Sequence, residues 1–218
     1  LAVRRSIQIP STESSARALQ QELAREVSTG QKFGLCAGVS LRTLDNQWVA
    51  VAVLLSSTNW SVVEKQKIVG NIPPGTSFEG CEGFREAPTM IEVLLRLRNT
   101  PDVVFVRGHG RAHPHKFGVA CHVGLTLEVP TLGVDVLWPP GCVRTGVMLG
   151  RGKQKRGFRS GLMHEATKEL VGIEIRTQDN QDPLFVSPGH RLSLDDCAQM
   201  ALRAASFFRM PEPLRQAE

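Results

Sequence analysis

One stretch, residues 102–124, constrains the fold of this chain more than any other. It reads Asp-Val-Val-Phe-Val-Arg-Gly-His-Gly-Arg-Ala-His-Pro-His-Lys-Phe-Gly-Val-Ala-Cys-His-Val-Gly. The apolar run 103–106 is short enough to be a strand buried on both faces, and the glycines after it end it. We expect a helix to begin near Pro114. Open α/β sheets bind ligands where a buried strand continues through a glycine-rich turn into a helix. Chemistry is therefore expected at residues 107–113.

Length and composition favour one α/β domain, and the pattern of apolar runs and turns adds a mixed sheet with flanking helices. The 218 residues are 41% hydrophobic, enough for a full core, and no composition break divides them. We therefore expect a single domain over 1–218, with 1–10 as an extended arm. The 26 Lys and Arg against 21 Asp and Glu give a net charge of +5, which weakly favours an anionic partner. No apolar run reaches the length of about 18 residues that spans a membrane.

The five cysteines are odd in number, scattered, and form no Cys-x-x-Cys pair that would hold zinc. We interpret them as reduced thiols of the core, which indicates a reducing compartment such as the mitochondrial matrix, cytoplasm or nucleus. The start Leu-Ala-Val-Arg-Arg-Ser lacks acidic residues, which is compatible with a removed transit peptide.

Hydrophobic periodicity and turn residues predict the remaining elements. Helices are predicted at residues 12–28 and 86–98, and from a capping box at Ser193 and Asp196 onward. Strands are predicted at residues 33–41, 47–55, 60–69, 102–106, 131–137 and 143–149, with a hairpin over 161–176 that turns near 165–168. Short polar connections make the first three strands an antiparallel meander, whereas the two short buried runs should be parallel. Residues 71–80, which contain Pro-Pro-Gly, should form an exposed loop.

A basic segment lies between two of these strands. Residues 151–159 read Arg-Gly-Lys-Gln-Lys-Arg-Gly-Phe-Arg and show no apolar periodicity. We expect a mobile cationic loop. It is either a solvated loop or a contact for nucleic acid, with Phe158 available to stack on a base.

Several ordered segments resemble the endonuclease V family, metal-dependent nucleases that cut nucleic acid near inosine on an RNase H-like fold. The central stretch keeps the family's Gly108, Gly110, His113, Pro114, Gly118, His122 and Gly124. Phe-Arg-Glu-Ala-Pro at 84–88, Ser-Pro-Gly-His-Arg-Leu-Ser at 187–193 and Arg-Met-Pro-Glu-Pro-Leu-Arg at 209–215 are also similar to family segments. The resemblance runs from about Phe33 to Leu214 and implies an RNase H-like mixed sheet.

The positions that hold the metals in this family differ here. The resemblance places its three carboxylates at Ser40, Glu86 and Arg107, and its lysine at Val136. The wedge loop aligns with residues 76–79, and the chain contains no tyrosine.

A single carboxylate is therefore expected at the metal-binding positions. Magnesium needs hard oxygen ligands, and Arg107 adds a repulsion of roughly 4 kcal/mol per unit charge at ~4 Å and an effective dielectric of ~20. Asp45 and Asp102 lie five residues from the lost positions, and Asp135 should face the other side of its strand. We expect no metal or other cofactor, unless the site has been rebuilt to hold Mg²⁺.

Glu86 has two interpretations, a remaining metal ligand or a carboxylate paired with Arg107 or Arg85, and we favour the second. His113, His122 and His190 could orient a phosphate or stabilise loops. Gly108 and Gly110 could leave room for a nucleic-acid base or allow the backbone conformation of the tight turn. The candidate nucleic-acid-binding residues are Arg85, Gly108, Gly110, Arg111, His113, Lys116, His122, Arg151, Lys153, Lys155, Arg156, Arg159 and His190.

These changes lead us to expect a pseudoenzyme and not an enzyme: a subunit that binds nucleic acid or serves an architectural role. Its expected partner is RNA or a protein–RNA assembly, through backbone phosphates, with further protein subunits and no membrane. The alternative is an active metal-dependent, inosine-specific endonuclease with a rebuilt site. Whether Arg107 blocks the chemistry decides between the two.

Overall fold

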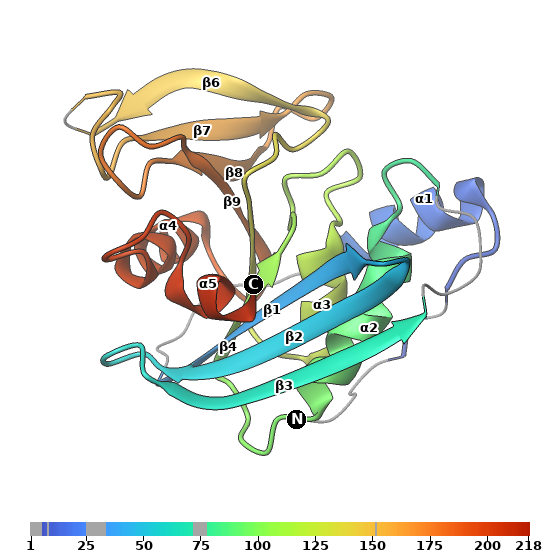
Figure 1. The fold of residues 1–218 in the computed structure, drawn as a ribbon. Helices are drawn as coiled ribbons and strands as arrows, with labels where there is room; N and C mark the ends of the chain where they lie inside the picture. The colour runs from blue at the N-terminus through green and yellow to red at the C-terminus, as the bar shows by residue number, and fades with distance from the viewer. Residues whose placement is uncertain (1–5, 8, 25–33, 72–77, 151) are drawn as a thin grey trace.

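A nine-stranded mixed sheet runs through the computed structural model (Figure 1), which describes residues 6–7, 9–24, 34–71, 78–150 and 152–218. The strand order is β3-β2-β1-β4-β5-β9-β8-β7-β6. This arrangement confirms the predicted α/β class with a mixed sheet.

The first half of the sheet follows the sequence prediction closely. It contains β1 (Leu35–Leu44), β2 (Gln47–Ser56), β3 (Val62–Asn71), β4 (Val103–Arg107) and β5 (Thr131–Asp135). The first three strands form the predicted antiparallel meander. β4 lies between β1 and β5 and is parallel to both. Every residue of β4 before Arg107 is buried, as expected of a central strand covered on both faces.

The second half of the sheet contains one strand that the sequence analysis missed. It consists of β6 (Cys142–Leu149), β7 (Arg159–His164), β8 (Leu170–Ile175) and β9 (Leu184–His190). β7 and β8 form the predicted hairpin. β9 is antiparallel to both β5 and β8 and is buried throughout. Its Pro188 and Gly189 concealed it, because both residues normally argue against a central strand.

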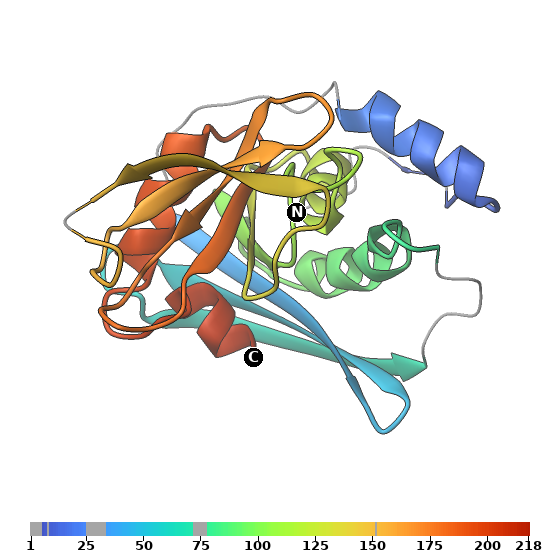
Figure 2. The same cartoon turned by 90° about the horizontal axis from the view of Figure 1, so that it is seen from above.

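Helices cover both faces of the sheet (Figures 1 and 2). On one face, α2 (Gly83–Leu95) and α3 (Val119–Leu127) pack against apolar residues of β1, β2 and β4. On the other face lie α4 (Leu194–Ala204), next to β8 and β9, and α5 (Glu212–Ala217), over β1 and β2. α1 (Glu13–Leu23) packs outside the sheet, where Ala16 and Leu23 join a cluster with residues of α2 and α3.

One helix start was predicted wrongly, and one helix was missed. Residues 114–118 form a turn, and α3 begins at Val119 after the extended Gly118 (φ −91°, ψ −176°). α5 was not predicted, because its six residues include a proline and are too short for a periodic pattern. The capping box that begins α4 is confirmed: the Ser193 Oγ accepts from the Asp196 N–H at 3.1 Å. The predicted helical residues 25–28, residue 33 and the loop residues 72–77 lie outside the described residues.

All five cysteines are free and buried, which confirms their interpretation as core thiols. Burial raises the pKa of Cys36 and of Cys121 to about 12, so both stay protonated at neutral pH. Among the described residues, no helix is long and apolar enough to cross a membrane.

Candidate functional site

The carboxyl ends of the three parallel strands meet at one edge of the sheet. Val39 of β1 is in register with Val106 of β4, and Arg107 is in register with Val134 of β5. Ser40 and Arg107 are therefore neighbours across two strands, with Asp135 at the end of the third. Together with Glu86 of α2, these residues make up what we call the strand-edge site.

Ser40 is buried (1% exposed) at this edge, and its hydroxyl donates to the carbonyl of Ala217 at 2.6 Å. That bond ties β1 to the end of α5. A carboxylate at this position could not donate to the same carbonyl, so serine is matched to the helix packed over it.

Arg107 is shared between two carboxylates. Its Nη1 donates to Asp135 Oδ1 at 3.0 Å, and its Nε lies 3.3 Å from Glu218 Oε1. The Arg107 side chain is 23% exposed. Its Nη2 has no hydrogen-bond partner among the described residues. Because a guanidinium carries five N–H donors, Arg107 keeps donors available for a ligand.

Asp135 corrects one expectation. Its alternating position in β5 predicted a side chain directed away from this edge, yet its carboxylate reaches Arg107. Oδ1 also accepts from the backbone N–H groups of Val136 at 2.6 Å and Leu137 at 3.0 Å. β5 ends at Asp135, so strand alternation no longer fixes where the carboxylate lies. Asp45 and Asp102 do not reach the edge: Asp45 lies in an exposed turn, and Asp102 accepts from Gly34 and Leu35 at the start of β1.

Glu86 is not paired, contrary to the favoured interpretation. Its carboxylate forms no hydrogen bond or ion pair with any described residue, while Arg85 lies over the Trp48 ring, 5.3 Å from its centroid. Burial raises the pKa of Glu86; Glu82 and Asp135 raise it further, and Arg85 lowers it. A carboxyl with a raised pKa and no internal partner is suited to carrying a proton.

His109, which the sequence analysis did not select, belongs to the same electrostatic group. Burial lowers the pKa of His109, Asp135 raises it and Arg107 lowers it, so His109 lies close to both side chains. Its position inside the segment 107–113 was the one signal that could have identified it.

His113, His122 and His190 are buried, with at most 8% exposed. Burial lowers the pKa of His113 to about 3 and that of His122 to about 4, so both are neutral at physiological pH. The His122 ring packs edge-on against Phe84 and lies beside Phe117. The burial of both neutral rings, and the aromatic contacts of His122, favour the structural interpretation of His113 and His122 over binding of a phosphate. His190 ends β9.

Two glycines fix the turn after β4. Gly108 has a φ of +132°, which L side chains rarely adopt, and a Cβ on Gly110 would lie 2.2 Å from the carbonyl oxygen of Pro188. The turn and its packing against β9 are sufficient to explain both residues.

The basic loop between β6 and β7 is fixed by hydrogen bonds, contrary to the predicted mobile loop. Arg156 donates from its backbone N–H to Asp179 at 2.7 Å and from Nη2 to the carbonyl of Leu202 at 2.6 Å. Lys155 pairs with Asp179 at 3.0 Å. Phe158 is buried, so it cannot stack on a base. Arg159 approaches Asp195 at 3.7 Å, and Arg151 lies outside the described residues.

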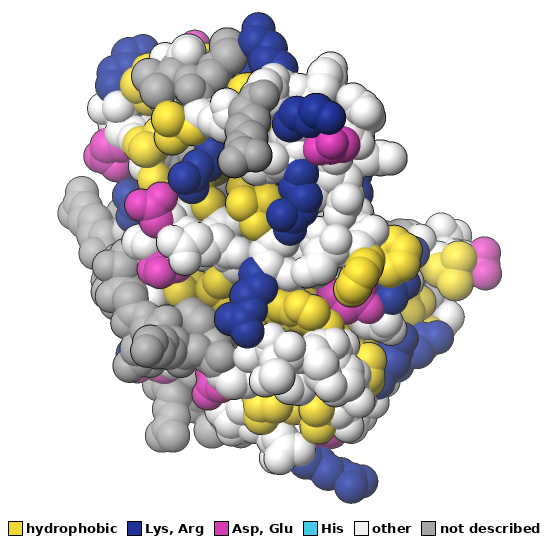
Figure 3. Space-filling view, turned by 90° about the vertical axis from the view of Figure 1, so that its left-hand side faces the viewer, with side chains coloured by type: hydrophobic (Ala, Val, Ile, Leu, Met, Phe, Trp, Pro, Cys, Tyr) yellow, Lys and Arg dark blue, Asp and Glu magenta, His cyan; other side chains and the backbone are white. Residues whose placement is uncertain are grey.

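Basic side chains are dispersed on this side of the molecule. On the face shown in Figure 3, Lys and Arg alternate with hydrophobic, uncharged and acidic side chains. The dispersed charge argues against one continuous cationic track over this face.

The architecture defines a class of protein before any comparison: an α/β protein with a polar site at the carboxyl ends of parallel strands. The Endonuclease V family model matches residues 17–218. Endonuclease V of Gloeobacter violaceus is 35% identical over 215 residues, covering 94% of this chain and 83% of that protein. Endonuclease V of Azotobacter vinelandii is 36% identical, covering 95% and 92%.

Solved structures agree. Endonuclease V of Streptomyces avermitilis superposes with a TM-score of 0.84 at 33% identity, covering 100% of this chain and 94% of that one. Endonuclease V of Ciona intestinalis, in complex with DNA containing an inosine followed by a ribo-adenosine, has a TM-score of 0.76 at 19% identity, covering 94% and 93%. At that identity it supports the fold alone. The chain belongs to the endonuclease V family.

Membership in this family overturns the expectation that the chain is not an enzyme. Its relatives at about 35% identity, matched over more than nine-tenths of the chain, are named Endonuclease V, the name of an enzyme. The replacements at Ser40, Arg107 and Val136 were too narrow a basis for that expectation, because Glu86 has no partner among the described residues and Asp135 lies at the same edge.

A divalent metal does not fit the positions at which the family resemblance places it. The Ser40 hydroxyl is committed to Ala217, Arg107 brings a positive charge, and Val136 is apolar. In the part of the chain that the structure describes, no three His, Cys, Asp or Glu side chains are arranged to hold a metal ion. Any chemistry at the strand-edge site is therefore derived below from its protein groups.

Proposed function

We propose that this protein is an endonuclease that acts on nucleic acid through a strand-edge site rebuilt around Glu86, Arg107 and Asp135. The observation that carries the proposal is the match to relatives named Endonuclease V, at about 35% identity over more than nine-tenths of the chain. The residues that match the family model include α2, which positions Glu86, and the loop after β4.

Each group at the edge has a role that its surroundings support. Glu86 exchanges a proton, because burial raises its pKa and no described residue occupies its oxygens. Arg107 donates from Nη2, which binds no other described residue, to a phosphate oxygen of the strand, a charge-assisted bond. Asp135 holds the guanidinium in place, since its Oδ1 is itself fixed by two backbone N–H groups.

The proposed substrate is a DNA or RNA strand that contains inosine. The support is membership in the endonuclease V family, whose resemblance implies cleavage near inosine. One protein of that name, from Ciona intestinalis, was solved in complex with DNA that contains an inosine. In this chain the loop that aligns with the family's wedge carries Phe78 and no tyrosine, and Phe78 packs against the cluster under α1. Base selection therefore depends on groups other than a wedge tyrosine.

The test is cleavage of labelled oligonucleotides, with and without inosine, as DNA and as RNA, in Mg²⁺, in Mn²⁺ and in EDTA. The purified protein is expected to cut an inosine-containing strand, and Glu86→Gln is expected to reduce the rate by at least ~10²-fold, the usual contribution of a general acid–base. The matched control is Glu92→Gln, an exposed residue of the same helix that pairs with Arg96 at 2.9 Å. Absence of cleavage under every condition, or cleavage that Glu86→Gln leaves unchanged, contradicts the proposal.

Membership in a ribonucleoprotein stays a prediction. Its support is the cationic loop, in which Lys153 is exposed and forms no ion pair with a described residue. Crosslinking from residues 152–159 in cells tests it, and crosslinks to neither RNA nor protein would exclude this loop as the contact.

A further inference from the structure

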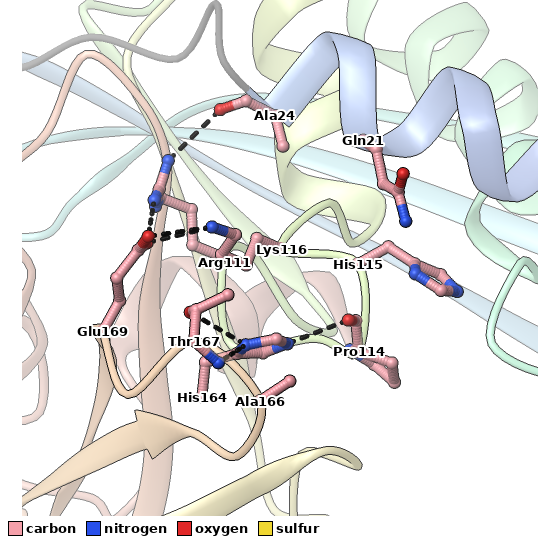
Figure 4. Close-up of a pocket in the computed structure, with 10 residues that line it drawn as sticks. All are labelled: Gln21, Ala24, Arg111, Pro114, His115, Lys116, His164, Ala166, Thr167 and Glu169. Atoms are coloured by element: carbon pink, nitrogen blue, oxygen red, sulfur yellow. Dashed lines mark hydrogen bonds and ion pairs between the residues drawn. The ribbon is translucent and has the colours of Figure 1, made fainter.

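A pocket of about 550 Å³ is lined by none of the strand-edge residues. Figure 4 shows the side chains that line it. Three segments distant in sequence form its walls: the end of α1, the turn at residues 111–116, and the β7–β8 turn at residues 164–169. We call it the hairpin pocket. Its size suits a nucleotide or a smaller anion better than a long strand.

Two cations in this pocket converge on one acid. Arg111 Nη2 lies 3.3 Å from Glu169 Oε2, and Lys116 Nζ lies 3.0 and 3.1 Å from the two oxygens of Glu169. The two cationic side chains are only 26% and 24% exposed, whereas Glu169 is 48% exposed. The cations belong to the pocket wall, and the acid enters it from a surface turn.

The backbone holds both cations in position. The Arg111 backbone N–H donates to the Pro188 carbonyl at 2.7 Å, and its Nη1 donates to the Ala24 carbonyl at the end of α1 at 3.2 Å. Lys116 has a φ of +54°, a conformation that costs a residue with a Cβ free energy and persists only where the surroundings fix it. Arg111 and Lys116 are therefore preorganised.

His164 fixes the opposite wall. Its Nδ1 accepts from the Thr167 backbone N–H at 3.1 Å, so its Nε2 carries the proton and donates to the Pro114 carbonyl at 2.9 Å. This bond joins the β7–β8 turn to the turn that carries Lys116. The pocket keeps its shape through His164, independently of the Glu169 ion pairs.

We infer that the hairpin pocket is a phosphate-binding site in which the Glu169 carboxylate occupies the position of the anion until a phosphate displaces it. Arg111 and Lys116 offer donors from two directions, which suits a tetrahedral anion with several acceptor oxygens. The pKa of Glu169 is lowered, mainly by its bond to Lys116, so the carboxylate is itself an anion at neutral pH. Arg111, Lys116 and Glu169 together carry one net positive charge while Glu169 is paired with them. The two cations carry two positive charges when the Glu169 carboxylate moves away.

The phosphate can be free, part of a mononucleotide, or the end of a strand, and binding assays separate these sources. The probes are orthophosphate, adenosine 5′-monophosphate, and one oligonucleotide carrying either a 5′-phosphate or a 5′-hydroxyl, each titrated by calorimetry. None of these measurements requires cleavage. A failure to bind phosphate is therefore distinguishable from a failure to cut nucleic acid.

The variants are chosen to change affinity in opposite directions. Arg111→Gln and Lys116→Gln are each expected to weaken phosphate binding about tenfold, the usual effect of losing one charge-assisted bond. Glu169→Gln is expected to strengthen it about threefold to tenfold, because the competing anion is gone. The matched control is Glu165→Gln on the same turn, whose side chain is exposed and forms no ion pair with a described residue. It is expected to bind like the wild type.

Three results would overturn the inference: no phosphate probe binds wild type or Glu169→Gln, Glu169→Gln binds no more tightly than Glu165→Gln, or the Arg111 and Lys116 variants bind like wild type. Thermal unfolding of each variant shows whether a lost affinity reflects a lost fold. The probe with the highest affinity identifies the source of the phosphate.

Discussion

The strand-edge site and the hairpin pocket take residues from the same segment after β4, yet their ion pairs are arranged differently. At the strand edge, the Arg107 guanidinium bridges Asp135 and Glu218, Glu218 also pairs with Arg42, and the carboxyl of Glu86 lies nearby. In the hairpin pocket, two cations share one carboxylate. The strand-edge site is therefore suited to exchanging protons, and the hairpin pocket to binding an anion.

The charge of one residue does not define a site. Arg107 was expected to repel a divalent ion, whereas in the structure it pairs with Asp135 and Glu218. Three predictions, from the largest expected effect down, test the two sites and their surroundings, and a fourth tests the cationic loop.

Gly110→Ala should have the largest effect, because Gly110 lies between the two sites. Its added Cβ would meet the Pro188 carbonyl oxygen at 2.2 Å, a contact with backbone that cannot easily move. We expect a loss of about 3 kcal/mol or more in the free energy of unfolding, measured with urea, and impaired function of both sites together. Gly70→Ala, whose Cβ meets no atom within 4 Å, is the control. Damage confined to one site would show that the segment does not couple them.

Asp135→Asn should affect the strand-edge site strongly. It leaves the largely buried Arg107 without its full counter-charge, which should cost roughly 1–3 kcal/mol of unfolding free energy. It should also lower the pKa of Glu86, because a negative neighbour that raises this pKa is removed. Glu169→Gln in the hairpin pocket should change stability by under about 0.5 kcal/mol, since Glu169 is half exposed. Carboxyl NMR titration and urea unfolding measure both effects, and equal costs would contradict the contrast.

The pH dependence of stability should separate Glu86 from His113. The folded-state pKa of His113 is about 3 against 6.5 when exposed, so its contribution is present above pH 6.5 and is lost as the pH falls toward 3. The pKa of Glu86 is raised above 4.5, so its contribution is present below pH 4.5 and is lost as the pH rises. His113→Asn should reduce the loss of unfolding free energy at acid pH by up to about 1.4 kcal/mol per pH unit. Glu86→Gln should remove the loss of unfolding free energy that Glu86 causes as the pH rises above 4.5. Urea unfolding from pH 4 to 7.5 measures both, and slopes unchanged by either variant would refute the assignment.

Lys153→Gln should have the smallest effect and bears on the cationic loop, which belongs to neither site. If Lys153 contacts a phosphate of a single strand, the slope of log affinity against log salt should flatten by about 0.7. Lys155→Gln should flatten it less, because Asp179 already offsets that charge at 3.0 Å. Filter binding over a range of salt concentrations measures the slope. Unchanged slopes in both variants would remove the loop from the nucleic-acid contact.

Much of the fold could be predicted from the sequence because its signals are local. The meander has short polar turns, the two buried runs have the length of central strands, and the capping box at Ser193 marks the start of α4. β9 and α5 could not be predicted in this way. Pro188 and Gly189 are tolerated in β9 by its pairing with β5 and by the loop packed on it, and α5 is held by its contacts with β1 and β2.

The sequence by itself determined the family, the segment that carries the site, and which carboxylates are absent from their expected positions. Only the tertiary structure decided how the remaining charges combine. Asp135 reaches Arg107 because β5 ends there, and Glu86 has no partner among the described residues because Arg85 lies over Trp48. Glu169 contacts two cations from a turn more than fifty residues away. The physical reason is that Coulomb interactions depend on distance in space and on burial, and neither is encoded in local sequence spacing.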